Sequence, residues 1–244
     1  MTTDLPVVRA PDTNFLGLVD FPFEPHYHDL DGLRMAYLDE GPADAPVALL
    51  LHGMPTWSYL YRSVIPPLLV AGYRCVAPDH IGFGRSDKVT DPDWYTIARH
   101  TANLQRLIET LDLRNITIFV QDWGGPTGLA QVATMPERFS RLVIMNTWLH
   151  HDGYEYSPGI QNWITQNLPG GLFREHVPTA FNWGTLMVVG TGRGAPQDVL
   201  VPLLQGGEAV LSEEAEAVRR AYDAPFDGLG EGAVAGPRMF PLSI

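Results

Sequence analysis

Apolar runs alternate with stretches of helical periodicity through the first 147 residues of the chain. A continuous apolar run such as 47–51 is typical of a strand buried on both faces, whereas apolar residues three and four apart indicate a helix. The segment 33–40 alternates, which predicts a half-buried edge strand, and residues 1–32 are expected to lie along the surface before the first strand. Strands are predicted at 33–40, 47–51, 74–78, 116–120 and 141–146, and helices at 58–71, 97–111 and 126–135. This order predicts an α/β fold with a mostly parallel, doubly wound sheet.

The alternation stops at about residue 148. Residues 150–230 hold short helical patches interrupted by Pro and Gly, of which 213–222 predicts an amphipathic helix. We therefore expect a core at 1–147, a helical cap at 148–230 over the strand ends where α/β proteins bind ligands, and a return to the core at 231–244. The glycine pattern at 190–195 resembles a dinucleotide-binding loop, but no helix and second strand follow, which favours a flexible loop.

Composition narrows the range of partners. The 244 residues are 45% hydrophobic, enough for a sizeable core, and 16 basic against 28 acidic residues give a net charge of −12. That charge argues against nucleic acid or an anionic membrane as the main partner. The single cysteine, Cys75, lies in a predicted core strand and is interpreted as a small buried apolar residue. Without a signal peptide or a membrane-spanning run, a cytoplasmic protein is expected.

The chemical signal is strongest directly after the strand 116–120, where the chain reads Val120-Gln121-Asp122-Trp123-Gly124-Gly125. A strand, a sharp turn and a helix form the context in which α/β-hydrolases present their nucleophile, which is usually serine. A carboxylate that displaces a leaving group from saturated carbon gives an ester that water can cleave, so Asp122 suits a two-step covalent route. The helix N-terminus is expected to keep this carboxylate ionised. The alternative is an ordinary N-cap aspartate.

The chain resembles the haloalkane dehalogenases of the α/β-hydrolase superfamily. The resemblance is carried by the segments 52–62, 77–88, 112–117, 120–125, 145–146, 221–226 and, more loosely, 236–241, with a weak stretch at about 165–210. The block 120–125 is much more specific than a bare strand–turn–helix pattern. The resemblance implies hydrolysis of a small halogenated organic substrate to an alcohol and a halide ion, without a metal or an organic cofactor.

The resemblance also implies roles for single residues. Asp122 would be the nucleophile, and the backbone N–H groups of Met54 and Trp123 would form the oxyanion hole. The Trp123 indole would be one halide donor and Trp163 the second, with Trp183 as the alternative. Pro225 and Phe226 would line the substrate pocket.

Two expected groups are not found at their places. The family uses a histidine close to the C-terminus and an acid that orients it, but the histidines here are His26, His28, His52, His80, His100, His150, His151 and His176. Asn146 stands where some relatives carry the acid, and no carboxylate follows before Asp152. We therefore expect the last core strands, the catalytic histidine and the acid to be missing. An incomplete turnover and a dimer or aggregate formed through an exposed sheet edge would follow.

Two other functions stay open. An epoxide hydrolase also uses an aspartate in this turn, and it would need paired cap tyrosines, for which Tyr154, Tyr156 and Tyr222 are candidates. A catalytically inactive binding protein of the same fold is the second alternative, because the histidine is not found at its expected place.

Overall fold

The computed structural model describes residues 5–149, 153–171, 187–188 and 211–242. The chain divides into two compact units. Unit 1 comprises Met1–Arg9, Pro22–Glu155 and Gly230–Ile244, and unit 2 comprises Ala10–Phe21 and Tyr156–Leu229. Residues 10–21 thus group with unit 2, apart from the rest of the expected core segment 1–147. The inserted helical cap at 148–230 stays a prediction.

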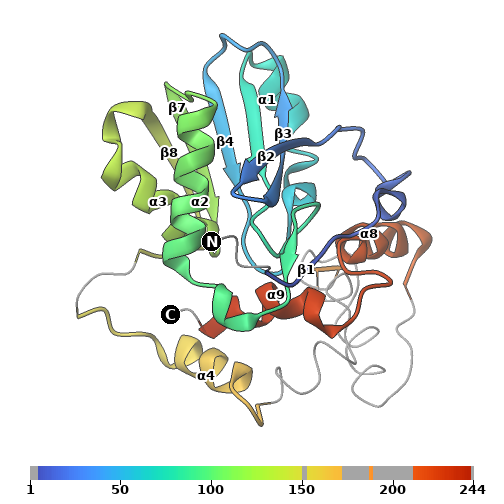
Figure 1. Cartoon of the computed structure of the whole chain (residues 1–244). Coiled ribbons are helices and arrows are strands. Elements are labelled where there is room, and N and C mark those ends of the chain that lie inside the picture. Colours follow the sequence, from blue (N-terminus) through green and yellow to red (C-terminus); the bar gives the residue numbers. More distant parts are fainter. Residues whose placement is uncertain (1–4, 150–152, 172–186, 189–210, 243–244) are drawn as a thin grey trace. The chain divides into compact units, whose positions relative to one another are not determined.

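Unit 1 is built on a six-stranded sheet. Its strands are β2 (His26–Leu30), β3 (Leu33–Glu40), β4 (Val47–Leu51), β5 (Arg74–Pro78), β7 (Ile116–Gln121) and β8 (Phe139–Met145). They lie in the order β2-β3-β5-β4-β7-β8 (Figure 1). The pairs β2–β3 and β3–β5 are antiparallel, whereas β5, β4, β7 and β8 run parallel. A separate pair joins β1 (Val7–Val8) to β6 (Lys88–Val89). The predicted α/β fold with a mostly parallel sheet is confirmed.

The core of unit 1 lies where β4 and β7 pack against a helix. All five residues of β4 are buried, as its unbroken apolar sequence predicts for a strand between two neighbours. Leu49 and Ile118 share a cluster with Leu104 and Ile108 of α2 (Ile97–Thr110). Beside α2 lies α3 (Gly124–Thr134), which follows β7 (Figure 1). This packing fixes the end of β7, from which the candidate site is built.

The expected edge position of β3 is wrong. β2 covers β3 as an antiparallel hairpin partner, so residues 1–32 contain strands. The turn between them is Asp31-Gly32, with φ of 57° and 97°. An Asp-Gly pair with two positive φ values is the favoured two-residue hairpin turn, and this signal identifies β2 in the sequence.

The expected helix at 58–71 is two shorter elements. A 3₁₀ helix spans Ser58–Tyr61, and α1 spans Ile65–Val70 with Pro66 and Pro67 in its first turn. Proline has no N–H to donate to a preceding carbonyl, so the helix can begin at these residues but cannot run through them.

Unit 2 contains the α-helices α4 (Pro158–Asn167) and α8 (Glu213–Asp223). Ser157 and Ser212 cap their N-termini by accepting from the N–H groups of Ile160 and Ala215. The Asn14 amide donates to the carbonyl oxygens of Ala224 and Asp227 at 3.1 and 2.9 Å. The remaining described helices are α9 (Ala235–Met239) and the 3₁₀ turns Asp12–Phe15, Pro92–Trp94, Pro136–Arg138, Glu231–Val234 and Phe240–Leu242. In the described part of the chain, no helix is long and apolar enough to span a membrane.

Candidate active site

Asp122 occupies the turn between β7 and α3, the strand–turn–helix context that the sequence predicts. We call residues 121–124 the Asp122 turn. Asp122 has a φ of 50°, in the left-handed region that non-glycine residues rarely adopt. Its N–H donates to the carbonyl oxygen of Asn146, 3.2 Å away and directly after the neighbouring parallel strand β8. The sheet thereby holds the turn at the carboxyl ends of its strands, where α/β folds bind ligands.

Glycines allow the backbone to pack closely around this turn. A Cβ atom on Gly53 would lie 2.3 Å from the Oδ1 atom of Asp122, and one on Gly124 would lie 2.4 Å from the carbonyl oxygen of Leu51. Neither distance is sterically possible without movement. The loop after β4 can therefore approach the carboxylate only because these two positions have no side chain.

The carboxylate of Asp122 faces two backbone donors. The N–H of Met54 donates to Oδ1 at 2.8 Å, and the N–H of Trp123 also donates to this carboxylate. Both hydrogen bonds favour the ionised form, but burial is the larger effect and raises the pKa of Asp122 above its usual 3.8. The N-cap of α3 is Trp123 and makes no side-chain cap hydrogen bond, so the alternative of Asp122 as an ordinary N-cap is not observed.

An apolar wall surrounds the ring of Trp123, the residue that follows Asp122. Trp123 packs edge-on against Trp148 and Phe240, with ring centroids 5.1 and 5.5 Å apart, and Phe83 completes this cluster. Neither Trp148 nor Phe240 has a role predicted from the sequence. Trp148 directly follows a strand that runs parallel to β7, and parallel strands have their carboxyl ends at the same edge of the sheet. Its position in the sequence could therefore have indicated that it lies near Asp122.

The described histidines near the turn are buried and neutral. His52 Nδ1 lies 2.9 Å from the carbonyl oxygen of Gly53, and its Nε2 accepts from the N–H of His80 at 3.0 Å. Burial lowers the pKa of His52 to about 4 and the pKa values of His80 and His100 well below 6.5. Among the residues that the structure describes, no histidine hydrogen-bonds to Asp122, and no three His, Cys, Asp or Glu could together hold a metal ion. His150, His151 and His176 lie outside the described residues.

The remaining predicted site residues belong to unit 2. Trp163 is half-buried on α4, Pro225 is buried, and Phe226 is half-buried in the turn after α8. Tyr222, an epoxide-hydrolase candidate, is buried on α8. Trp183 lies outside the described residues. The roles of all five stay predictions.

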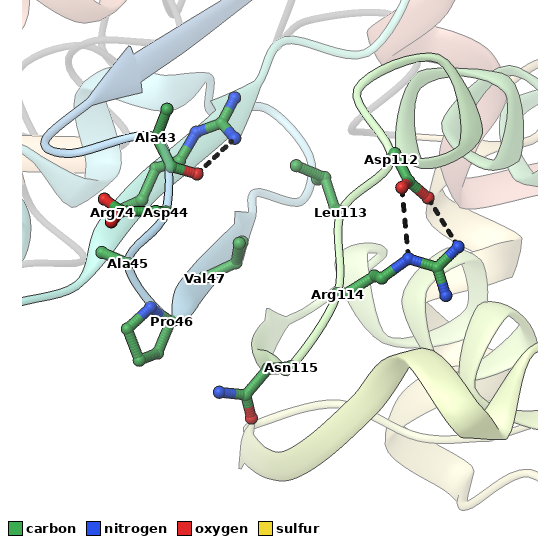
Figure 2. A pocket seen from close by; sticks show the side chains of 10 residues that line it. All are labelled: Ala43, Asp44, Ala45, Pro46, Val47, Arg74, Asp112, Leu113, Arg114 and Asn115. Atoms are coloured by element: carbon green, nitrogen blue, oxygen red, sulfur yellow. Dashed lines mark hydrogen bonds and ion pairs between the residues drawn. The ribbon is translucent and has the colours of Figure 1, made fainter.

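A cavity of about 250 Å³ lies at the opposite end of the sheet (Figure 2). Its lining includes Val47, Arg74 and Asn115, at the amino ends of β4, β5 and β7, whereas Asp122 follows the carboxyl end of β7. The arginines beside it already have acidic partners, Arg74 with Asp39 and Arg114 with Asp112. This cavity is therefore separate from the candidate active site.

Comparison with known proteins agrees with this geometry. The model of the alpha/beta hydrolase fold family matches residues 46–171. The chain is 40% identical over 243 residues to a haloalkane dehalogenase of Psychrobacter cryohalolentis, covering 98% of this chain and 71% of that protein. A tetrameric haloalkane dehalogenase structure from Paraglaciecola agarilytica NO2 is similar at 37% identity and a TM-score of 0.79, covering 98% and 72% of the two chains. An epoxide hydrolase from hot-environment metagenomes is 25% identical with a TM-score of 0.59, covering 91% and 71%.

The fold and the family model define an α/β-fold hydrolase. Within that class, the chain belongs to the haloalkane dehalogenase family, whose members act on carbon–halogen bonds.

Proposed function

We propose that this chain cleaves carbon–halogen bonds of small haloalkanes with Asp122 as the nucleophile. A carboxylate oxygen attacks the carbon, and the carbon–halogen bond breaks with its electron pair leaving on the halide. The observation that carries the proposal is the hydrogen bond from the Met54 N–H to Oδ1. In an ester formed through the other oxygen, Oδ1 is the carbonyl oxygen, and the same donor then stabilises the negative charge that develops when water attacks.

Ester hydrolysis needs a base that takes a proton from the attacking water. The nearby described histidines are buried, and their lowered pKa values make them poor proton acceptors. We therefore expect the alkyl ester on this chain to persist.

The test is intact-mass spectrometry after incubation with 1-bromobutane. One butyl group should be added to the folded protein, and the isosteric variant Asp122→Asn should remain unmodified. No adduct on folded protein would remove the nucleophile assignment. Many turnovers of bromide per chain would keep Asp122 as the nucleophile and contradict the persistent ester. Diol formation from 1,2-epoxybutane without bromide release would instead favour the epoxide hydrolase.

We also propose that Trp123 and Trp163 bind the leaving halide through their indole N–H groups. Halide ions are weakly hydrated and suit a donor on an apolar wall such as the one around Trp123. Bromide should then quench tryptophan fluorescence saturably, and Trp163→Phe should weaken binding by roughly 1–3 kcal/mol. Trp94→Phe is the matched control, because Trp94 packs against Tyr95 and His100. An unchanged bromide affinity in Trp163→Phe would transfer the second role to Trp183 or another donor.

A further inference from the structure

The segment that follows β8 is bound to the Asp122 turn by three interactions. Asn146 accepts the N–H of Asp122, the Thr147 hydroxyl donates to the Asp122 carbonyl oxygen at 2.5 Å, and Trp148 packs on Trp123. We call residues 146–148 the β8 strap. A Cβ atom on Gly125 would lie 1.7 Å from the Thr147 hydroxyl oxygen, so this glycine makes room for the threonine.

The Thr147 hydroxyl hydrogen-bonds to the peptide group that joins Asp122 to Trp123. The carbonyl of Asp122 and the N–H of Trp123 belong to the same planar peptide, in which they point in opposite directions. The carbonyl accepts from the Thr147 hydroxyl and from the N–H of Gly125 at 3.0 Å. On the other side of the same plane, the Trp123 N–H donates to the Asp122 carboxylate. A hydrogen bond that fixes the direction of the Asp122 carbonyl therefore also fixes the direction of the Trp123 N–H.

We propose that Thr147 is a positioning residue that orients the Trp123 N–H toward the reacting carboxylate. This inference rests on the proposed function of Asp122 and adds a residue outside the expected oxyanion-hole and halide groups. Asp122 has a φ of 50°, which a side chain disfavours, so the turn needs fixed partners to keep one peptide orientation. The hydroxyl at position 147 is such a partner, provided by a neighbouring strand rather than by the turn itself.

Thr147→Ala and Thr147→Ser separate the hydroxyl from the rest of the side chain. The measurement is the rate of Asp122 alkylation by 1-bromobutane as a function of pH, followed by intact mass. In Thr147→Ala we expect a rate about ten- to a hundredfold lower at neutral pH, the cost of a misplaced catalytic group. The acid limb of the rate–pH profile of Thr147→Ala should move to higher pH, because a misdirected Trp123 N–H no longer lowers the pKa of Asp122. Thr147→Ser should retain the wild-type rate and pH profile.

If Thr147 only stabilised the fold, its substitution would lower the thermal stability without shifting the pH profile of alkylation. Thr147→Val keeps the volume and lacks the hydroxyl, so it replaces Thr147→Ala if that variant does not fold. Thr134→Ala is the matched control, since the Thr134 hydroxyl donates to the carbonyl oxygen of Ala130 near the far end of α3. Wild-type rate and profile in Thr147→Ala, or a Thr147→Ser as impaired as Thr147→Ala, would overturn the proposal while leaving the nucleophile in place. A wild-type chain without adduct would overturn both.

Discussion

Asp122 combines an unfavourable backbone with an unfavourable environment. Its left-handed φ and its buried carboxylate both destabilise the fold, and the N–H groups of Met54 and Trp123 offset only part of the burial. Such local destabilisation is common at active sites, where the position of a residue is determined by the reaction. The sequence predicts the position and the local context of Asp122. It does not predict this balance, because the two donors come together only when the loop after β4 packs against the turn.

Replacing Asp122 with Asn should therefore stabilise the fold at neutral pH. The amide keeps the shape, removes the buried charge and tolerates positive φ better, so we expect a gain of roughly 0.5–2 kcal/mol in the free energy of unfolding. Because folding raises the pKa of Asp122, the wild-type penalty is absent below about pH 3.8 and complete above the folded-state pKa. Urea unfolding of both proteins from pH 4 to pH 8 should show the gain growing with pH. A constant or negative difference would contradict this balance.

At the scale of elements, the loop between β5 and β6 holds the loop after β4 in place. The Asp79 carboxylate accepts from the N–H groups of Ser58 and Arg85 at 2.7 and 2.9 Å. Lys88 is fully buried, and its ammonium donates to the carbonyl oxygens of Gly84 and Ser86 at 2.8 and 3.1 Å. The sequence shows these residues only as a polar loop within the family resemblance. Their burial follows from packing between distant strands.

Lys88 is the only lysine in the sequence, so its titration can be observed directly. Burial lowers the pKa of Lys88 to about 7, and the nearby carboxylates of Asp79 and Asp87 oppose that change only in part. In protein labelled with ¹³C at lysine Cε, the single signal should titrate near pH 7, and Lys88→Met should lack it. Since the unfolded chain keeps its proton up to about pH 10.4, this group should add stability as pH rises from about 7 to 10.4. A signal that titrates only above pH 10 would contradict the burial of the charge.

At the scale of the whole chain, strand positions follow from apolar patterns, while neighbours in the sheet do not. β4 and β5 have the bounds expected from sequence, because their residues are buried whatever strand lies beside them. The pairing of β3 with β2 depends on the turn at Asp31, and a pattern of apolar positions does not predict that turn. The candidate site divides in the same way. Asp122 is identified by its local motif, and Thr147 and Trp148 are recognised only once β8 is seen to lie beside β7.

Among the strands that the structure describes, β8 lies at the end of the sheet order and exposes large apolar side chains. If the chain self-associates as the sequence predicts, we expect the contact to form through this strand. Leu142 and Ile144 are 47% and 54% exposed. An edge strand with apolar side chains and few charges is a template for pairing with a second strand. In an antiparallel pair of two β8 strands centred on Leu142, Arg141 would face Val143, so no like charges oppose the contact.

We therefore expect concentration-dependent dimers or larger species in size-exclusion chromatography with light scattering. Leu142→Lys combined with Ile144→Lys should shift the protein toward monomer, because a charged side chain on an edge strand opposes pairing. Leu168→Lys is the matched control, since Leu168 is 46% exposed next to α4 in unit 2 and should have no effect on association. A wild-type chain that stays monomeric as its concentration is raised would show that the exposed residues of β8 do not drive pairing. Equal association in the double variant and the wild type would place the contact on another surface.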